Sequence, residues 1–216
     1  MIITGLILDI DGTLVNSNEV HRKSWTIALE KYGIFKEVNE IQIHSGKPSE
    51  EIVKILAETS DDNFAMKVAK EKTDLVMDMV DQIIIFPGVD ELLRELYKLG
   101  YLICFASANF NRLIERMLKI FNWDTLASGY VGTDNVIRSK PDPEMIFKSI
   151  NILNLPVNEC VVIGDSIYDI EAAKKAGTKS VAVCTGEFKK EEFEIYKPNL
   201  ILDKFVELRK YLPLNL

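Results

Sequence analysis

The stretch L-I-L-D-I-D-G-T, from Leu6 to Thr13, decides the fold and indicates the chemistry. Its apolar half belongs to a run at residues 2–8 that has the length of a buried strand. The two aspartates that follow are spaced i, i+2, which in extended chain places both carboxylates on one side. Two such carboxylates repel one another unless a positive charge lies between them, and a hard divalent cation would supply that charge. A polar Asp-Gly turn is the alternative, but it does not explain the buried strand leading into it.

Similar apolar runs recur along the chain and alternate with helix patterns. Strands are predicted at residues 102–106, 160–163 and 180–184, with weaker candidates at 128–131 and 200–202. Helices are predicted at residues 90–99, 111–120, 143–153 and 168–176, and Gly100 and Gly177 stop the first and last of these. Strands that alternate with helices predict an α/β fold, a doubly wound (Rossmann-like) parallel sheet.

One segment interrupts this alternation. Residues 18–83 show helix patterns and no convincing strand, with apolar positions grouped on three successive helices. We therefore predict a helical cap domain at residues 17–84, inserted into a core domain formed by residues 1–16 and 85–216. The Phe86-Pro87-Gly88 sequence at the return to the core is typical of a linker.

Composition limits the function classes. The 216 residues carry a formal net charge of −7, which argues against nucleic-acid or anionic-membrane binding, because both favour a basic surface. No targeting segment and no apolar run long enough to span a membrane is visible. The three cysteines, an odd number, lie in or beside apolar runs and fit buried free thiols in a reducing, cytoplasmic location.

A second acidic cluster follows the predicted strand at 160–163, in the sequence V-V-I-G-D-S-I-Y-D. Asp165 and Asp169 are four residues apart within it. Asp165 or Ser166 could simply cap the helix that follows. Helix capping would account for one acid but not for two at the mouth of the same sheet, where ligands bind in such folds.

Two further clusters could hold an anion. Lys140 lies in R-S-K-P-D-P, where the following proline keeps the loop extended. An isolated lysine is usually solvated, but beside four carboxylates Lys140 becomes a candidate for binding phosphate. Ser107 ends the strand at 102–106, within F-A-S-A-N, and its hydroxyl can donate to a phosphate oxygen. A plain strand-end turn would explain Ser107 equally well.

Taken in chain order, these four clusters and the helical insertion resemble the haloacid dehalogenase superfamily of phosphohydrolases. The resemblance covers nearly the whole chain, and the cap looks like that of phosphoglycolate phosphatases and β-phosphoglucomutase. It implies that Asp9 is the nucleophile and Asp11 the general acid and base. It implies phosphate binding by Gly12, Ser107, Ala108 and Lys140. Magnesium would be held by Asp9, Asp165 and the backbone carbonyl of Asp11, with Asp169 in the outer coordination sphere.

The chemistry adds an expectation about protonation. Covalent catalysis divides a slow hydrolysis into two easier steps, and Asp9 is suited to it because aspartate is ionised at neutral pH. Asp11 must carry a proton when it donates to the leaving group, so its pKa is expected to be raised by burial or by a closed cap. Leu8 in place of the phenylalanine of many relatives, and Ser107 in place of threonine, keep the same chemical character.

Three cap residues are further candidates by the same resemblance. His21, on the first cap helix, would lie near Asp11 and influence its position, although a helical histidine is more often only half-exposed surface. Gly46 and Lys47 begin a segment that looks like a substrate-specificity loop, and Lys47 could meet a carboxylate or second phosphate. Trp25 is expected to belong to the cap core.

The main hypothesis is thus a magnesium-dependent phosphatase acting on a small phosphorylated metabolite, phosphoglycolate-like or a sugar phosphate. A phosphosugar mutase is the alternative within the enzyme class. A non-catalytic phosphoacceptor or binding module is the alternative outside it, although such modules lack a large cap. The chain is expected to be a monomer or weak homodimer that binds neither nucleic acid nor membrane.

Overall fold

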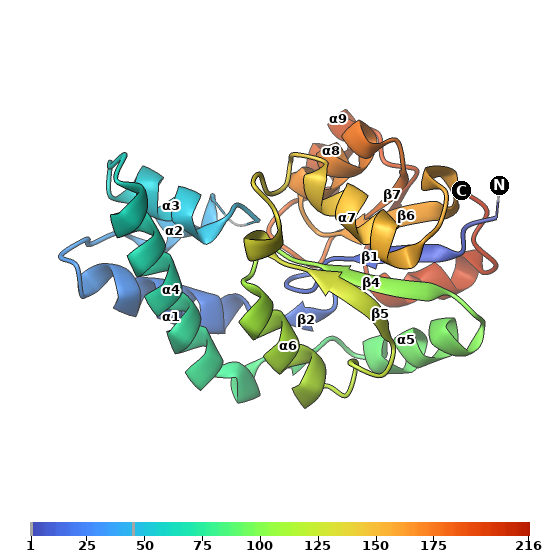
Figure 1. Cartoon of the computed structure of the whole chain (residues 1–216), viewed down its shortest axis with the longest axis horizontal. Helices are drawn as coiled ribbons and strands as arrows, with labels where there is room; N and C mark the ends of the chain where they lie inside the picture. The colour runs from blue at the N-terminus through green and yellow to red at the C-terminus, as the bar shows by residue number, and fades with distance from the viewer. Residues whose placement is uncertain (1, 45) are drawn as a thin grey trace.

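The computed structural model describes residues 2–44 and 46–216; Met1 and Ser45, which fall within the predicted core and cap, lie outside the described residues. The core is a parallel six-stranded sheet in the order β5-β4-β1-β6-β7-β8 (Figure 1). Its strands are β1 Gly5–Leu8, β4 Leu102–Ala106, β5 Ala127–Val131, β6 Cys160–Gly164, β7 Lys179–Val183 and β8 Leu200–Leu202. The predicted α/β sheet is confirmed, including both weaker strand candidates.

Helices cover both faces of the sheet. They are α5 Val89–Lys98, α6 Asn111–Ile120, α7 Glu144–Leu153, α8 Ile167–Ala176 and α9 Lys190–Tyr196, with 3₁₀ turns at Thr133–Asn135, Val157–Glu159 and Phe205–Tyr211. Alternate strand residues enter opposite layers: Leu6 and Leu8 pack with α5 and α6, whereas Ile7 packs with α7. This period-two burial on both faces is why the strands read as continuous apolar runs.

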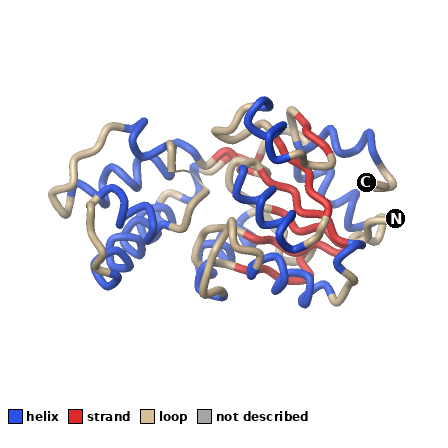
Figure 2. Tube along the Cα trace, turned by 90° about the horizontal axis from the view of Figure 1, so that it is seen from above, coloured by secondary structure: helices blue, strands red, loops and turns tan. Residues whose placement is uncertain are grey.

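The insertion after β1 folds as four helices, α1 Asn18–Glu30, α2 Val38–Gln42, α3 Ser49–Leu56 and α4 Asp62–Asp78, followed by a 3₁₀ turn at Val80–Gln82. They bury a small apolar cluster of their own, which includes Trp25, Leu29, Val53 and Val68. Figure 2 shows these helices as a group set beside the sheet, and both termini lie at the opposite end of the molecule. The helical content of the cap agrees with the sequence pattern, and its proposed limits stay a prediction.

Two very short strands, β2 Val15–Asn16 and β3 Ile84–Ile85, connect the cap to the core. They pair antiparallel, with Val15 opposite Ile85 and Asn16 opposite Ile84. Neither strand is predicted from the sequence, because two residues are too few to show an alternating pattern.

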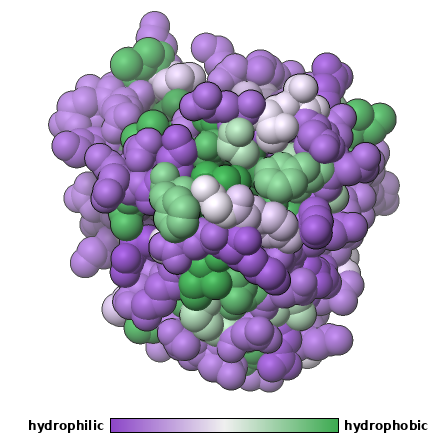
Figure 3. Space-filling view, turned by 90° about the vertical axis from the view of Figure 1, so that its left-hand side faces the viewer, coloured by the Kyte–Doolittle hydropathy of each residue, from purple (hydrophilic) through white to green (hydrophobic). Residues whose placement is uncertain are grey.

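No helix of the described part of the chain is long and apolar enough to cross a bilayer. The cap end of the molecule is mainly hydrophilic, with hydrophobic side chains in several separate groups (Figure 3). Cys104 and Cys160 are buried free thiols, and Cys184 is half-buried and also free.

Candidate active site

Three neighbouring strands end at one edge of the sheet, and each is followed by a predicted site residue. Asp9 follows β1, Ser107 follows β4 and Asp165 follows β6. β1 lies between β4 and β6, so the chain leaves it first toward one side of the sheet and later toward the other. Such a switch point opens a crevice at the carboxyl ends of the strands, where ligands bind in this architecture.

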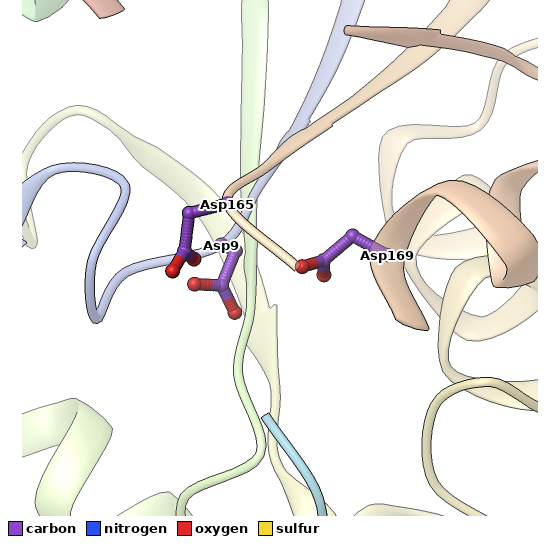
Figure 4. Close-up of side chains that lie close together, drawn as sticks. All are labelled: Asp9, Asp165 and Asp169. Atoms are coloured by element: carbon purple, nitrogen blue, oxygen red, sulfur yellow. The ribbon is translucent and has the colours of Figure 1, made fainter. Parts of the chain in front are cut away.

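Asp9, Asp165 and Asp169 form a compact acidic cluster in this crevice. One carboxylate oxygen from each lies within 4.8 Å of the others. Figure 4 shows Asp9 and Asp165 side by side at the strand ends, with Asp169 reaching toward them from α8. Asp9 and Asp169 are almost completely buried. A group of oxygen ligands at this spacing fits a hard divalent cation.

Lys140 ties two of these acids together from the loop before α7. Its Nζ donates to Asp9 Oδ1 at 2.7 Å, to Asp169 Oδ1 at 2.6 Å and to the carbonyl oxygen of Ala106 at 3.1 Å. Burial alone would lower the pKa of this ammonium, but the charges of Asp169 and Asp9 outweigh it and raise the pKa. Lys140 is therefore a permanent cation at the centre of the site.

The charges of the cluster do not balance without a ligand. Burial raises the pKa of Asp9 to about 7, against the opposing effect of Lys140, and raises the pKa of Asp165 well above its ordinary value. When all three carboxylates are ionised, they exceed the one ammonium by two negative charges, the charge that one divalent cation would neutralise. The donor set therefore fits such an ion.

Two glycines leave the room that the Asp165 carboxylate occupies. This carboxylate accepts a hydrogen bond from Thr13 Oγ1 at 2.9 Å. A Cβ on Gly12 would lie 2.2 Å from Asp165 Oδ2, and one on Gly186 only 1.8 Å from it. Gly12 also adopts a φ of +77°, which side-chain-bearing residues rarely adopt. Glycine is thus required on both sides of this carboxylate.

Asp169 uses both of its oxygens within the protein. Besides the Lys140 contact, its Oδ2 accepts from Ser166 Oγ at 2.6 Å and from the Ser166 backbone N–H at 3.2 Å. Ser166 Oγ in turn accepts from the Asp169 N–H, so the two residues form a capping box at the start of α8. Helix capping therefore accounts for Ser166 and Asp169, whereas Asp165 takes no part in it and faces the cavity.

Asp11 points away from the acidic cluster and toward the cap. Its Oδ1 lies 2.9 Å from His21 Nε2, and its Oδ2 accepts from Asn109 Nδ2 at 2.5 Å. Burial would raise the pKa of Asp11, but His21, Ser17 and Lys72 together hold it below its ordinary value. The expectation of a raised pKa is wrong for this arrangement, because burial brings hydrogen-bond donors as well as desolvation.

The remaining predicted residues line one cavity of about 130 Å³ between the core and the cap. Ser107 and Ala108 lie on the core side, with the Ser107 hydroxyl accepting from the Asn109 N–H at 3.2 Å. Gly46 and Lys47 lie on the cap side. A cavity of this size suits a ligand much smaller than a drug molecule.

The cap reaches the core through Gly46. A Cβ there would lie 3.0 Å from Tyr168 Cδ2 and 3.2 Å from Ser166 Cβ, both at the start of α8. Trp25 belongs to the cap core as expected, and it also lines the cavity. The cap thus contacts the core beside the acidic cluster, and both line the same cavity.

Sequence reasoning did not single out five residues of this site. Thr13 and Asn109 are the last residues of the motifs L-I-L-D-I-D-G-T and F-A-S-A-N, and their hydrogen-bond donors were the signal that could have found them. Thr185 and Gly186 follow β7; the Thr185 hydroxyl donates to the carbonyl oxygen of Gly12 at 2.5 Å. Their position after a predicted strand was the available signal. Lys72, in the middle of a cap helix, gave no signal at all.

Comparison with known proteins agrees with this geometry. Residues 6–183 match the family described as haloacid dehalogenase-like hydrolase. The chain is 29% identical over 212 residues to pyrophosphatase PpaX of Listeria monocytogenes, covering 95% of this chain and 94% of that protein. It is 30% identical to pyrophosphatase PpaX of Listeria innocua, with the same coverage of both proteins.

Solved structures give the same result. The crystal structure of a haloacid dehalogenase-like hydrolase from Bacteroides fragilis superposes with a TM-score of 0.88 and 27% identity. The match covers 95% of this chain and 99% of that one. Since the family match spans most of the chain and includes all the strands that carry the acidic cluster, the chain belongs to the haloacid dehalogenase-like hydrolases and is an enzyme of their phosphatase type.

Proposed function

We propose that the protein is a magnesium-dependent phosphatase that hydrolyses a small phosphate monoester, phosphoglycolate-like or a sugar phosphate, through an aspartyl-phosphate on Asp9. The observation that carries the proposal is the buried contact of Lys140 with both Asp9 and Asp169, at the mouth of a sheet that also presents Asp165. The relatives named pyrophosphatase add diphosphate to the candidate substrates.

The first step is attack of a carboxylate oxygen of Asp9 on phosphorus. A new oxygen–phosphorus bond forms while the bond to the leaving oxygen breaks. Lys140 reduces the repulsion between the anionic nucleophile and the anionic phosphate. Ser107 accepts from Asn109, and its own O–H has no acceptor among the residues described, so it is available to a phosphate oxygen.

Asp9 and Asp165, with the Asp11 carbonyl oxygen, would hold Mg²⁺, and Asp169 would orient Lys140 beside it. The ion would offset charge on the phosphate oxygens. Asp11 would give its proton to the leaving oxygen and then accept one from the water that attacks the aspartyl-phosphate. Because Asp11 is ionised in its present contacts with His21 and Asn109, it would have to leave them and take up a proton from solvent before it acts as the acid.

Asp9→Asn tests the nucleophile directly. Hydrolysis of a generic aryl phosphate should fall below detection, because an amide cannot form the acyl phosphate. Asp124→Asn, at an exposed position between α6 and β5, is the matched control and should keep full activity. Removing metal by chelation should abolish activity, and adding Mg²⁺ should restore it.

Substantial turnover by Asp9→Asn would end the nucleophile assignment. The same assay on a sugar phosphate separates hydrolysis from mutase activity, because a phosphatase releases free phosphate and a mutase returns an isomerised sugar phosphate.

A further inference from the structure

A buried lysine faces the cavity from the cap with no carboxylate of the described residues in ion-pair contact. Lys72, on α4, is 3% exposed and lines the cavity opposite the acidic cluster. Its Nζ lies 2.7 Å from His21 Nδ1 and 5.2 Å from the ring centroid of Trp25. Among residues 2–44 and 46–216, no carboxylate forms an ion pair with it.

This ammonium is incompletely satisfied. It has three N–H donors, and the described residues supply one acceptor, the imidazole of His21. A buried cation with no carboxylate in direct contact is costly, and the charge of Asp11 reaches Lys72 only across His21. Lys72 therefore has donors and charge to offer to a ligand that enters the cavity.

The cap presents a second cation to this cavity. Arg22 follows His21 in α1, is half-buried and lines the same cavity. It too forms no ion pair with a carboxylate in the described part of the chain. Lys47, by contrast, is already paired with Glu51 at 3.1 Å. The two walls of the cavity thus differ: the core side carries the acids already paired with Lys140, and the cap side carries Lys72 and Arg22, which form no ion pair among the described residues.

We propose that Lys72 and Arg22 form an oxyanion subsite for the leaving group, so that the preferred substrate carries a second negative charge close to the scissile bond. The inference rests on the proposed function, which places the transferring phosphate on the core side beside Asp9 and Lys140. The rest of the substrate then faces the cap. A cavity of about 130 Å³ keeps the two anionic groups near each other.

The second group is a phosphate or a carboxylate, since both offer the same oxygen acceptors to an ammonium and a guanidinium. A substrate whose leaving group is uncharged would leave both cations unpaired. The subsite therefore favours a diphosphate or a phosphorylated carboxylic acid over a neutral sugar phosphate.

The test compares kcat/KM of the Mg²⁺-loaded protein for three probes. Pyrophosphate and phosphoglycolate carry anionic leaving groups, and glycerol phosphate carries a neutral one. Lys72→Met and Arg22→Met should each lower kcat/KM about 10- to 100-fold for one or both anionic probes, and much less for glycerol phosphate. Lys70→Met, an exposed lysine of the same helix, is the control and should change none of them.

The pattern across probes separates this role from an indirect one. If Lys72 acts only by positioning His21, all three probes lose activity equally, and the subsite is overturned. A wild-type preference for glycerol phosphate overturns it as well. If the variants lose more kcat/KM for pyrophosphate, the second group is a phosphate; if they lose more for phosphoglycolate, it is a carboxylate.

A binding measurement tests the subsite without depending on turnover. Calorimetry should show methylenediphosphonate binding the wild-type protein at least ~10-fold more tightly than methylphosphonate, and Lys72→Met should remove the difference. Equal affinities would refute the subsite even if the enzyme is a phosphatase. Tight diphosphonate binding without hydrolysis of any phosphate ester would instead refute the proposed function.

Discussion

At the centre of the cavity, Asp11, His21 and Lys72 form a continuous series of contacts from core to cap. A charged Lys72 donates to His21 Nδ1, so His21 Nε2 carries the proton and donates to Asp11. This tautomer keeps Asp11 ionised. His21 belongs to the cap and Asp11 to the core, so a displacement of the cap that carried His21 away would remove a donor and favour the protonated acid.

Lys72 also makes substrate selection depend on pH. Burial lowers the pKa of Lys72 to about 8, with Asp11 opposing the shift and His21 as its other polar neighbour. Lys72 is therefore charged below this value and neutral above it. The ratio of kcat/KM for pyrophosphate to that for glycerol phosphate should fall as the pH rises through about 8.

The control is Lys72→Arg, which stays charged throughout and should move the fall in this ratio to higher pH. Ionisation of the substrates themselves is common to both proteins and cancels in the comparison. An identical profile for both proteins would show that Lys72 is not the titrating group.

Gly186 controls the space around Asp165, and its substitution should act on metal binding. In Gly186→Ala, the new Cβ would lie 1.8 Å from Asp165 Oδ2, so the carboxylate must shift. Displaced ligands of this kind typically cost at least ~10-fold in metal affinity. Calorimetric titration with Mg²⁺ measures it directly, with Gly100→Ala as control, since nothing lies within 4 Å of a Cβ there. Unchanged affinity would remove Asp165 from the metal site.

Trp123 joins helix α5 to the sheet. Its ring is fully buried and stacks on Phe105 of β4 with centroids 6.0 Å apart. Its Nε1 donates to Asp90 Oδ1, on α5, at 2.9 Å. Trp123→Ala should lower the free energy of unfolding by about 3–5 kcal/mol. Denaturant unfolding measures this loss. The control is Tyr97→Ala, at an exposed position of α5, which should lower the free energy of unfolding by under ~0.5 kcal/mol.

The elements also show what the sequence could reveal. The runs of β4 and β8 were predicted with their observed limits, because buried parallel strands are apolar throughout. The pairs Asp9–Asp11 and Asp165–Asp169 were legible because each follows such a run. Short elements were missed: α2 spans five residues, and α9 buries only Phe193. Lys72 was missed because its role arises from packing of the cap against the core, which no local pattern encodes.

For the whole molecule, the contact of Gly46 with α8 is where closure can be tested. The side chain of Gly46→Val would meet Tyr168 and Ser166 and hold the cap away from the core. We expect a larger radius of gyration by small-angle X-ray scattering and a loss of about 10- to 100-fold in kcat/KM, because the catalytic groups no longer meet. Gly33→Val is the matched control: it also has positive φ, but no neighbour within 4 Å. An unchanged radius with normal kinetics would show that this contact does not govern closure.

The pairing of β2 with β3 has a consequence for engineering. Since Asn16 lies opposite Ile84, the chain at residues 17–83 is topologically the loop of a β-hairpin. A two-residue Asn-Gly turn is the natural connection for such strands. The lid of a related enzyme can therefore be joined to this core at a single seam, provided that it supplies apolar side chains in place of Val20 and Val76, which pack in the main core.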